Sequence, residues 1–213
     1  EASRLDVRDR LETRDLRLHQ AQEAHKQRRV LERFKERARL VFDTEQAYRE
    51  MQASDELATI KAARRWGYPV KGIPAGRAEI VVARGNFHGR SSTVVGFSTA
   101  PGYRADFGPF APGFRHFDFG DIASLEAAIT DTTCAVLIEP IQGEAGIVLP
   151  PDGFLKAARR LCDERNVLLI LDEIQTGLGR TGTMFAYMHE DIRPDGVLVG
   201  KALGGGLLPV SAF

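Results

Sequence analysis

The chain has 213 residues, 43% of them hydrophobic, and equal numbers of acidic and basic side chains give a formal net charge of zero. That size and balance fit one α/β domain with an appendage, and they give no general reason to expect nucleic acid or an anionic membrane as a partner. No apolar run is long enough to span a bilayer and no signal-peptide pattern opens the chain, so we expect a cytoplasmic protein. Cys134 and Cys162 fall in predicted buried elements and are expected to be reduced thiols.

Residues 1–57 differ in kind from the rest of the chain. They contain neither Gly nor Pro and are rich in Arg, Glu, Asp and Gln, which favours helix. Apolar residues between Val30 and Phe42 recur on one helical face. We therefore expect a charged helical segment that packs on the domain or on a second subunit. A basic arm that meets an acidic partner is the alternative, although the interleaved Glu32 and Glu36 argue against it.

Residues 58–213 alternate short apolar runs with helical patterns, which predicts an α/β fold: a mostly parallel sheet with helices on both faces. A helix is expected from about Glu56 to Tyr68, and a long Gly- and Pro-rich loop from Thr99 to Gly113. Asp121 is expected to cap a helix from Ile122 to Ile129. The other expected strands are Ala78–Ala83, Arg115–Phe119, Cys134–Ile138, Val167–Asp172 and Gly196–Gly200, with a last strand that begins at Pro209. Further helices are expected to end near Phe97 and to span Pro151–Asn166 and Met184–Glu190.

An acid and an amine each follow an apolar run of the predicted sheet. Asp172 ends the run that begins at Val167, and Lys201 comes directly after the run Gly196–Gly200. Ligands bind at the carboxyl edge of open α/β sheets, so both side chains are candidates for Schiff-base chemistry. An amine must lose its proton before it forms a Schiff base, and burial helps a lysine to do so. A buried carboxylate, in turn, can keep the nitrogen of a bound pyridine ring protonated. The alternatives are a turn-capping role for Asp172 and a solvated loop position for Lys201.

Two longer motifs favour the chemical interpretation. The segment Leu171–Gly182 resembles the cofactor-aspartate segment of class III aminotransferases, which are fold-type I pyridoxal phosphate enzymes. The segment Gly200–Pro209 resembles their Schiff-base lysine segment, and the order and separation of the two also match. The resemblance is nearly continuous from about Ile60 to Phe213 and is strongest to the ornithine aminotransferases. It implies that residues 58–213 are part of the large cofactor-binding domain, with Lys201 and Asp172 as catalytic residues.

The same resemblance implies the remaining contacts to pyridoxal phosphate. Phe87 is expected to stack on the pyridoxal ring, and an aromatic face suits a flat heteroaromatic ring. His88 matches a position beside the cofactor, Glu139 one near the ring hydroxyl, and Gln175 one that touches the ring oxygen. A core phenylalanine and a packed or surface histidine are the alternatives for Phe87 and His88. No metal site is predicted.

Two charged residues are expected on the substrate side. By resemblance, Arg90 clamps the substrate carboxylate, a task that suits its planar fork of donors. A surface ion pair is the alternative for Arg90. Glu144 matches a residue that pairs with an arginine in the C-terminal domain of the family. Glu139 and Glu144 could also suggest the paired acids of a glycosidase, but the stretch Glu139–Gly146 resembles the aminotransferase segment instead.

The resemblance implies a ping-pong transfer of the terminal amino group of ornithine to 2-oxoglutarate through a pyridoxal phosphate Schiff base. The partners would then be a small-molecule amino donor and a 2-oxo acid, and the enzyme would be a homodimer. One alternative is a class III enzyme for acetylornithine or 4-aminobutyrate. The other is a truncated, catalytically silent remnant that acts as a binding or assembly module.

Two departures from the family pattern support the silent alternative. Glu50–Leu57 stands where the family carries a small-residue turn of the type Asn-Thr-Gly-Ala-Glu-Ala, whose amides hold the cofactor phosphate. Asp55 and Glu56 would repel a phosphate there. The chain also begins without Met and stops at Phe213, so we expect a truncated or processed form that lacks the C-terminal domain of the family.

Overall fold

The computed structural model describes residues 28–29, 31–39, 41–42, 57–208 and 210–213 of the chain. The chain divides into two compact units, Glu1–Ala47 and Tyr48–Phe213. The described residues of the first unit are helical, and the apolar side chains of Leu31, Phe34, Val41 and Phe42 are exposed. The predictions made for residues 1–27 and for the phosphate-turn segment Glu50–Glu56 fall on residues outside this description.

The second unit is built on a sheet whose described strands run in the order β2-β1-β3-β4-β5, with every neighbouring pair parallel. The central strand β3 is buried along its whole length, which explains why it appears in the sequence as an unbroken apolar run. The predicted α/β fold with a parallel sheet is therefore confirmed. The strands are β1 (Glu79–Ala83), β2 (Phe114–Phe117), β3 (Thr133–Ile138), β4 (Leu168–Asp172) and β5 (Gly196–Leu198).

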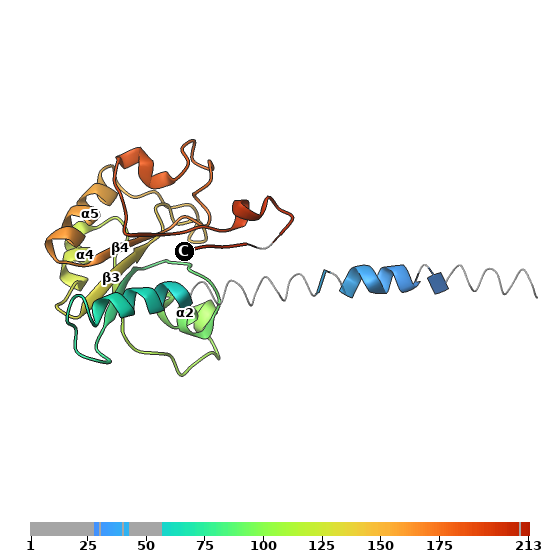
Figure 1. Cartoon of the computed structure of the whole chain (residues 1–213), viewed down its shortest axis with the longest axis horizontal. Coiled ribbons are helices and arrows are strands. Elements are labelled where there is room, and N and C mark those ends of the chain that lie inside the picture. Colours follow the sequence, from blue (N-terminus) through green and yellow to red (C-terminus); the bar gives the residue numbers. More distant parts are fainter. Residues whose placement is uncertain (1–27, 30, 40, 43–56, 209) are drawn as a thin grey trace, which may run out of the picture. The chain divides into compact units, whose positions relative to one another are not determined.

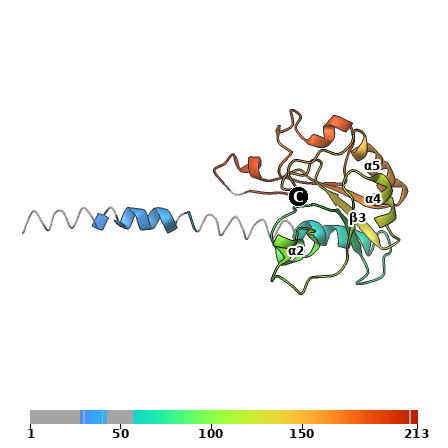
Figure 2. The same ribbon diagram turned by 180° about the vertical axis from the view of Figure 1, so that it is seen from behind.

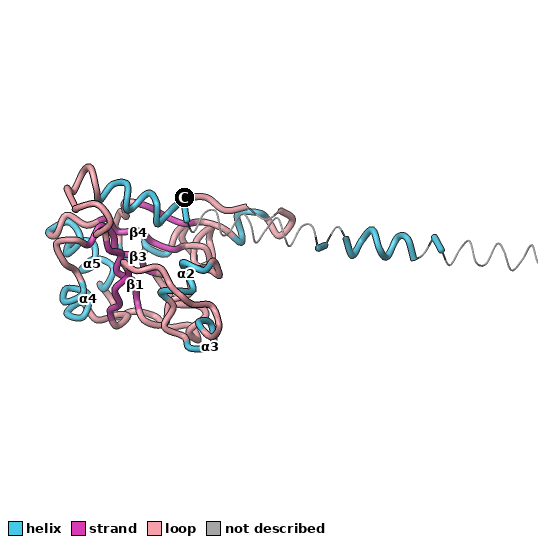
Figure 3. The backbone as a smooth tube through the Cα atoms, turned by 90° about the horizontal axis from the view of Figure 1, so that it is seen from below, coloured by secondary structure: helices cyan, strands magenta, loops and turns pink. Residues whose placement is uncertain are grey.

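Helices cover both faces of the sheet (Figure 1), and the same arrangement is seen from behind (Figure 2). Helices α4 (Ile122–Ala128) and α5 (Phe154–Glu164) pack on one face, and the helix at 57–67 packs with α2 (Ser92–Phe97) on the other. Figure 3 shows β1, β3 and β4 standing between these two helical layers. Alternate residues of β1 enter the two cores, Val81 facing α4 and α5 and Val82 facing α2. None of the described helices is long and apolar enough to cross a membrane.

Local signals explain several element boundaries. The Asp121 carboxylate accepts a hydrogen bond from the Ser124 N–H at 3.1 Å and caps α4, as predicted. The buried face predicted for α5 is also observed, because Phe154, Leu155, Ala158 and Leu161 are all in the core. Two short 3₁₀ helices follow the later strands, η1 (Ala186–Glu190) and η2 (Lys201–Gly204).

Two expectations about local structure are modified by the structure. The segment Thr99–Gly113 is mostly loop, as expected, but it contains the one-turn helix α3 (Pro101–Arg104). A proline at its first position suits a helix start, because that N–H has no partner within the helix. At the end of the chain, the expected strand is reduced in the described residues 210–213 to a single antiparallel bridge between Val199 and Ala212.

Candidate functional site

A cavity of about 230 Å³ lies at the carboxyl ends of the parallel strands. Phe87 lies in the loop that follows β1, Glu139 follows β3 directly, Asp172 ends β4, and Lys201 follows β5. This edge is the usual ligand-binding place of an open α/β sheet. The cavity is lined by every residue that the sequence singled out for a role at the site: Phe87, His88, Arg90, Glu139, Glu144, Asp172, Gln175 and Lys201.

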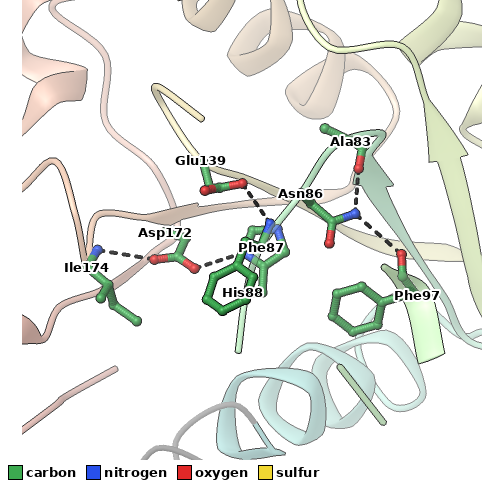
Figure 4. Close-up of polar contacts among 8 residues, drawn as sticks. All are labelled: Ala83, Asn86, Phe87, His88, Phe97, Glu139, Asp172 and Ile174. Atoms are coloured by element: carbon green, nitrogen blue, oxygen red, sulfur yellow. Dashed lines mark hydrogen bonds and ion pairs between the residues drawn. The ribbon is translucent and has the colours of Figure 1, made fainter. Parts of the chain in front are cut away.

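Asp172 is a buried carboxylate with two fixed partners. Its Oδ2 lies 2.8 Å from His88 Nδ1, and its Oδ1 accepts a hydrogen bond from the Ile174 N–H at 3.1 Å (Figure 4). The second bond spans two residues and forms an Asx-type turn, so Asp172 does cap a turn while it also lines the cavity. His88 is buried as well, and its ring lies 6.0 Å from that of Phe97. His88 is therefore a packed histidine that orients the carboxylate.

Glu139 ties the end of β3 to the loop after β1. Its Oε2 accepts a hydrogen bond from the Phe87 N–H at 3.0 Å (Figure 4). Burial raises the pKa of Glu139 to about 7; His88 opposes that rise and the Asp172 carboxylate adds to it. Glu139 can consequently accept or release a proton near neutral pH at the wall of the cavity.

The loop after β1 holds Phe87 in place. The side-chain amide of Asn86 is buried and donates to the carbonyls of Ala83 and Phe97 (Figure 4). These bonds satisfy backbone acceptors and fix the turn that leads to Phe87. Phe87 and Ile174 both line the cavity, which therefore offers aromatic as well as aliphatic surface.

Lys201 occupies a more exposed position than Asp172. It opens η2 with a φ of 45°, in the left-handed region, and its side chain is exposed. Just before it, Val199 exchanges two backbone hydrogen bonds with Ala212, at 3.0 and 2.9 Å. These bonds bring Val210, Ser211 and Ala212 to the cavity wall. Sequence reasoning missed those three residues, because no local pattern predicts a long-range bridge of this kind.

Arg90 and Glu144 lie at the exposed side of the cavity. Within the described residues, neither side chain forms an ion pair, so the surface ion pair considered for Arg90 is not observed there. Gln175 packs against Gly143, where a Cβ atom would stand 2.7 Å from Gln175 Oε1. Gly143 therefore gives Gln175 the room that it needs beside the cavity.

The residues present fit the ring end of a pyridoxal phosphate. A buried oriented carboxylate suits a protonated pyridine nitrogen, an aromatic wall suits the ring face, and Lys201 brings a primary amine to the same cavity. No group of three or more His, Cys, Asp or Glu side chains in the described part of the chain is placed to hold a metal ion.

Comparison with known proteins agrees with this fit. A family model described as "Aminotransferase class-III" matches residues 52–213. An ornithine aminotransferase of Bordetella pertussis is 60% identical over 153 residues, which are 72% of this chain and 37% of that protein. The relative from Brevibacillus brevis is 58% identical over 153 residues, 72% of this chain and 38% of its own length. The chain thus spans little more than a third of these relatives.

Solved structures show the same likeness. The ornithine aminotransferase of Toxoplasma gondii ME49 matches with a TM-score of 0.74 and 44% identity, covering 76% of this chain and 38% of that one. The acetylornithine aminotransferase of Elizabethkingia anophelis matches with a TM-score of 0.62 and 47% identity, covering 75% of this chain and 39% of that one.

Proposed function

This chain belongs to the class-III aminotransferases, and from that premise we propose that it carries the cofactor-binding part of a pyridoxal phosphate-dependent ornithine aminotransferase. The observation that carries the proposal is the meeting of Lys201, Asp172 and Phe87, from three different strand ends, around one cavity. The proposed reaction moves the terminal amino group of ornithine to 2-oxoglutarate. Ornithine is favoured as donor because the relatives with 57–60% identity bear that name.

The side of the cavity that carries Asp172, its acid side, is proposed to stabilise the charge that develops on the cofactor ring. Pyridoxal phosphate, when bound, supplies a ring that accepts the electrons of a carbanion. The Asp172 carboxylate, oriented by His88 and by the Ile174 N–H, would hold a proton at the ring nitrogen. Phe87, whose backbone N–H is fixed by Glu139, would stack on the ring. Gln175 is proposed to contact the ring oxygen.

The amine side performs proton transfer and substrate binding. Lys201 Nζ would hold the cofactor until the amine of the substrate displaces it, and the freed amine would then carry a proton between the two carbon atoms that exchange it. Its exposed position leaves room for this movement. Arg90 is proposed to bind the substrate carboxylate, and Glu144 to lie on the substrate side. A homodimer and a cytoplasmic location remain part of the proposal.

An absorbance titration with pyridoxal phosphate tests this function. The wild-type chain should develop a saturable visible band that Lys201→Ala lacks. Lys61→Ala is the matched control, because Lys61 is an exposed lysine on the helix at 57–67 and is not among the residues that line the cavity. Ornithine should then bleach the band. A band of equal strength in Lys201→Ala, or none in the wild type, would contradict the proposal and support the silent binding or assembly module.

A second candidate donor is acetylornithine. It is favoured by the 47% identity to the acetylornithine aminotransferase of Elizabethkingia anophelis. Adding ornithine, acetylornithine and 4-aminobutyrate to separate samples of the loaded chain distinguishes the donors. The proposal predicts that ornithine bleaches the band fastest.

A further inference from the structure

The guanidinium of Arg90 lies beside two neighbouring aromatic rings and contacts both. Its Cζ is 5.6 Å from the centroid of the Phe87 ring and 5.7 Å from that of Tyr103. The two rings are themselves 5.5 Å apart with an interplanar angle of 57°. A cation over the face of an aromatic ring at such distances is attracted by the ring quadrupole. Arg90 is therefore held by a pair of adjacent rings although it is exposed.

This arrangement leaves the hydrogen-bonding capacity of Arg90 unused. Within the described residues, Arg90 makes neither an ion pair nor a hydrogen bond, and the contacts with the two rings occupy none of its N–H donors in the plane of the guanidinium. Arg90 also lines two adjoining cavities, the main one and a second of about 150 Å³ that Tyr103 and Val94 help to enclose. A planar set of N–H donors at the border between two cavities is suited to bind a carboxylate.

The segment that carries Tyr103 is itself fixed. Arg104 Nη1 donates to the Ser98 carbonyl at 3.2 Å, and the Arg104 guanidinium lies 4.6 Å from the centroid of the Phe110 ring. Phe110 in turn packs against Gly96 of α2, where an added Cβ would come within 3.2 Å of the ring. Tyr103 thus faces Arg90 from an anchored turn, and this turn is the helix α3 that the sequence did not predict.

We propose that Tyr103 is a positioning residue that holds the Arg90 guanidinium, through the face of its ring, ready to bind the carboxylate of an amino acid substrate. The proposal rests on the function proposed above, since it assigns how that site recognises the acid end of its donor. Tyr103 acts through its ring and not through its hydroxyl, so phenylalanine should replace it and an aliphatic residue should not.

The first test observes Arg90 without any ligand or cofactor. The Nε–Hε resonance of Arg90 is assigned in a ¹⁵N–¹H spectrum by its loss in Arg90→Lys. Because its guanidinium lies over the faces of both rings, this proton should be shifted upfield from the other arginine signals. Tyr103→Phe should keep that shift, and Tyr103→Leu should lose a large part of it. An Arg90 signal at the same place in wild type and Tyr103→Leu would overturn the proposal.

The second test measures binding of ornithine and of 1,4-diaminobutane, which has the same carbon chain and amines without the carboxylate. Tyr103→Leu should weaken ornithine binding about three- to tenfold, the size expected for loss of one cation–π contact, and should leave the diamine unaffected. Tyr103→Phe should bind ornithine within about twofold of wild type. Equal losses for both ligands, or equal losses in Tyr103→Phe and Tyr103→Leu, would overturn a role through the ring face.

The two proposals fail separately. Tyr103→Leu should still develop a saturable pyridoxal phosphate band, since Lys201 and Asp172 are untouched. A missing band in every variant contradicts the proposed function, while the ligand-free Arg90 spectrum still decides whether Tyr103 positions Arg90.

Discussion

The acid and the amine of the cavity are held in different ways. Asp172 ends an interior strand, is buried, and is fixed by His88 and the Ile174 N–H. Lys201 follows the edge strand β5, which has only three residues, and is exposed on a 3₁₀ turn. The difference indicates that the fold holds the acid side of the cavity, at Asp172, in a fixed position, whereas the amine side, at Lys201, stays accessible. In the proposed reaction, the Asp172 carboxylate keeps its charge throughout, which a rigid position favours, and the Lys201 amine bonds and leaves the cofactor, which an accessible position favours.

The largest expected difference between the two sides is in stability. Asp172→Ala leaves the buried His88 nitrogen and the Ile174 N–H without their acceptor, so we expect the free energy of unfolding to fall by about 3 kcal/mol. Lys201→Ala changes an exposed side chain and should cost less than about 0.5 kcal/mol. Urea denaturation of the two variants beside the wild type measures both values.

Asp172→Asn is the matched control for this comparison. The amide keeps the shape and can still accept from the Ile174 N–H, so the loss should be about 1 kcal/mol. Equal destabilisation by Asp172→Ala and Lys201→Ala would contradict the distinction between a built acid side and an accessible amine side.

The next effect is the dependence of stability on pH through Glu139. Burial raises its pKa from 4.5 to about 7, so the folded state binds the proton more tightly than the unfolded state. The stabilisation is fully present below pH 4.5, decreases as the pH rises, and is lost above about pH 7. The expected contribution is about 3 kcal/mol over this window.

Glu139→Gln isolates that contribution, because a neutral amide cannot titrate. Denaturation curves between pH 4.5 and 7.5 should show a smaller loss of stability with rising pH in the variant than in the wild type. Parallel pH profiles for the two proteins would show that Glu139 does not titrate in this range.

The smallest effect concerns the closed cores on the two faces of the sheet, in contrast to its open carboxyl edge. Burial raises the pKa of Cys134 to about 11 and that of Cys162 to about 12, and both are free thiols. At pH 8 only about one Cys134 side chain in a thousand is then a thiolate. Ellman's reagent should modify neither thiol in the native chain and both in urea. Fast modification of the native chain would contradict a closed core.

The sequence predicted much of this architecture, for physical reasons that individual residues show. Interior strands such as β3 and β4 are buried on both faces and therefore form short apolar runs. Because the sheet is parallel, Asp172 and Lys201, which follow such runs, were expected at one edge, and the structure places them there. Asp121 was found because a helix cap depends on neighbours three residues away.

The parts that the sequence did not predict depend on long-range contacts. The composition of Thr99–Gly113 indicates a loop, but Arg104 folds one turn of it through Ser98 and Phe110. The segment that carries Ser211 reaches the cavity only through the bridge between Val199 and Ala212. The resemblance alone placed His88 beside the expected cofactor, whereas its contact with Asp172 joins a loop to a strand end 84 residues away.

The measurement that tests the central claim most directly is reduction of the loaded chain with borohydride, followed by peptide mapping by mass spectrometry. Reduction makes a bond between a lysine and pyridoxal phosphate permanent. The account predicts one label per chain, on the peptide that contains Lys201. It also predicts weaker labelling in Asp172→Asn, whose amide cannot keep the ring nitrogen protonated. Label spread over exposed lysines such as Lys61, or no label at all, would contradict a pyridoxal phosphate site at this cavity.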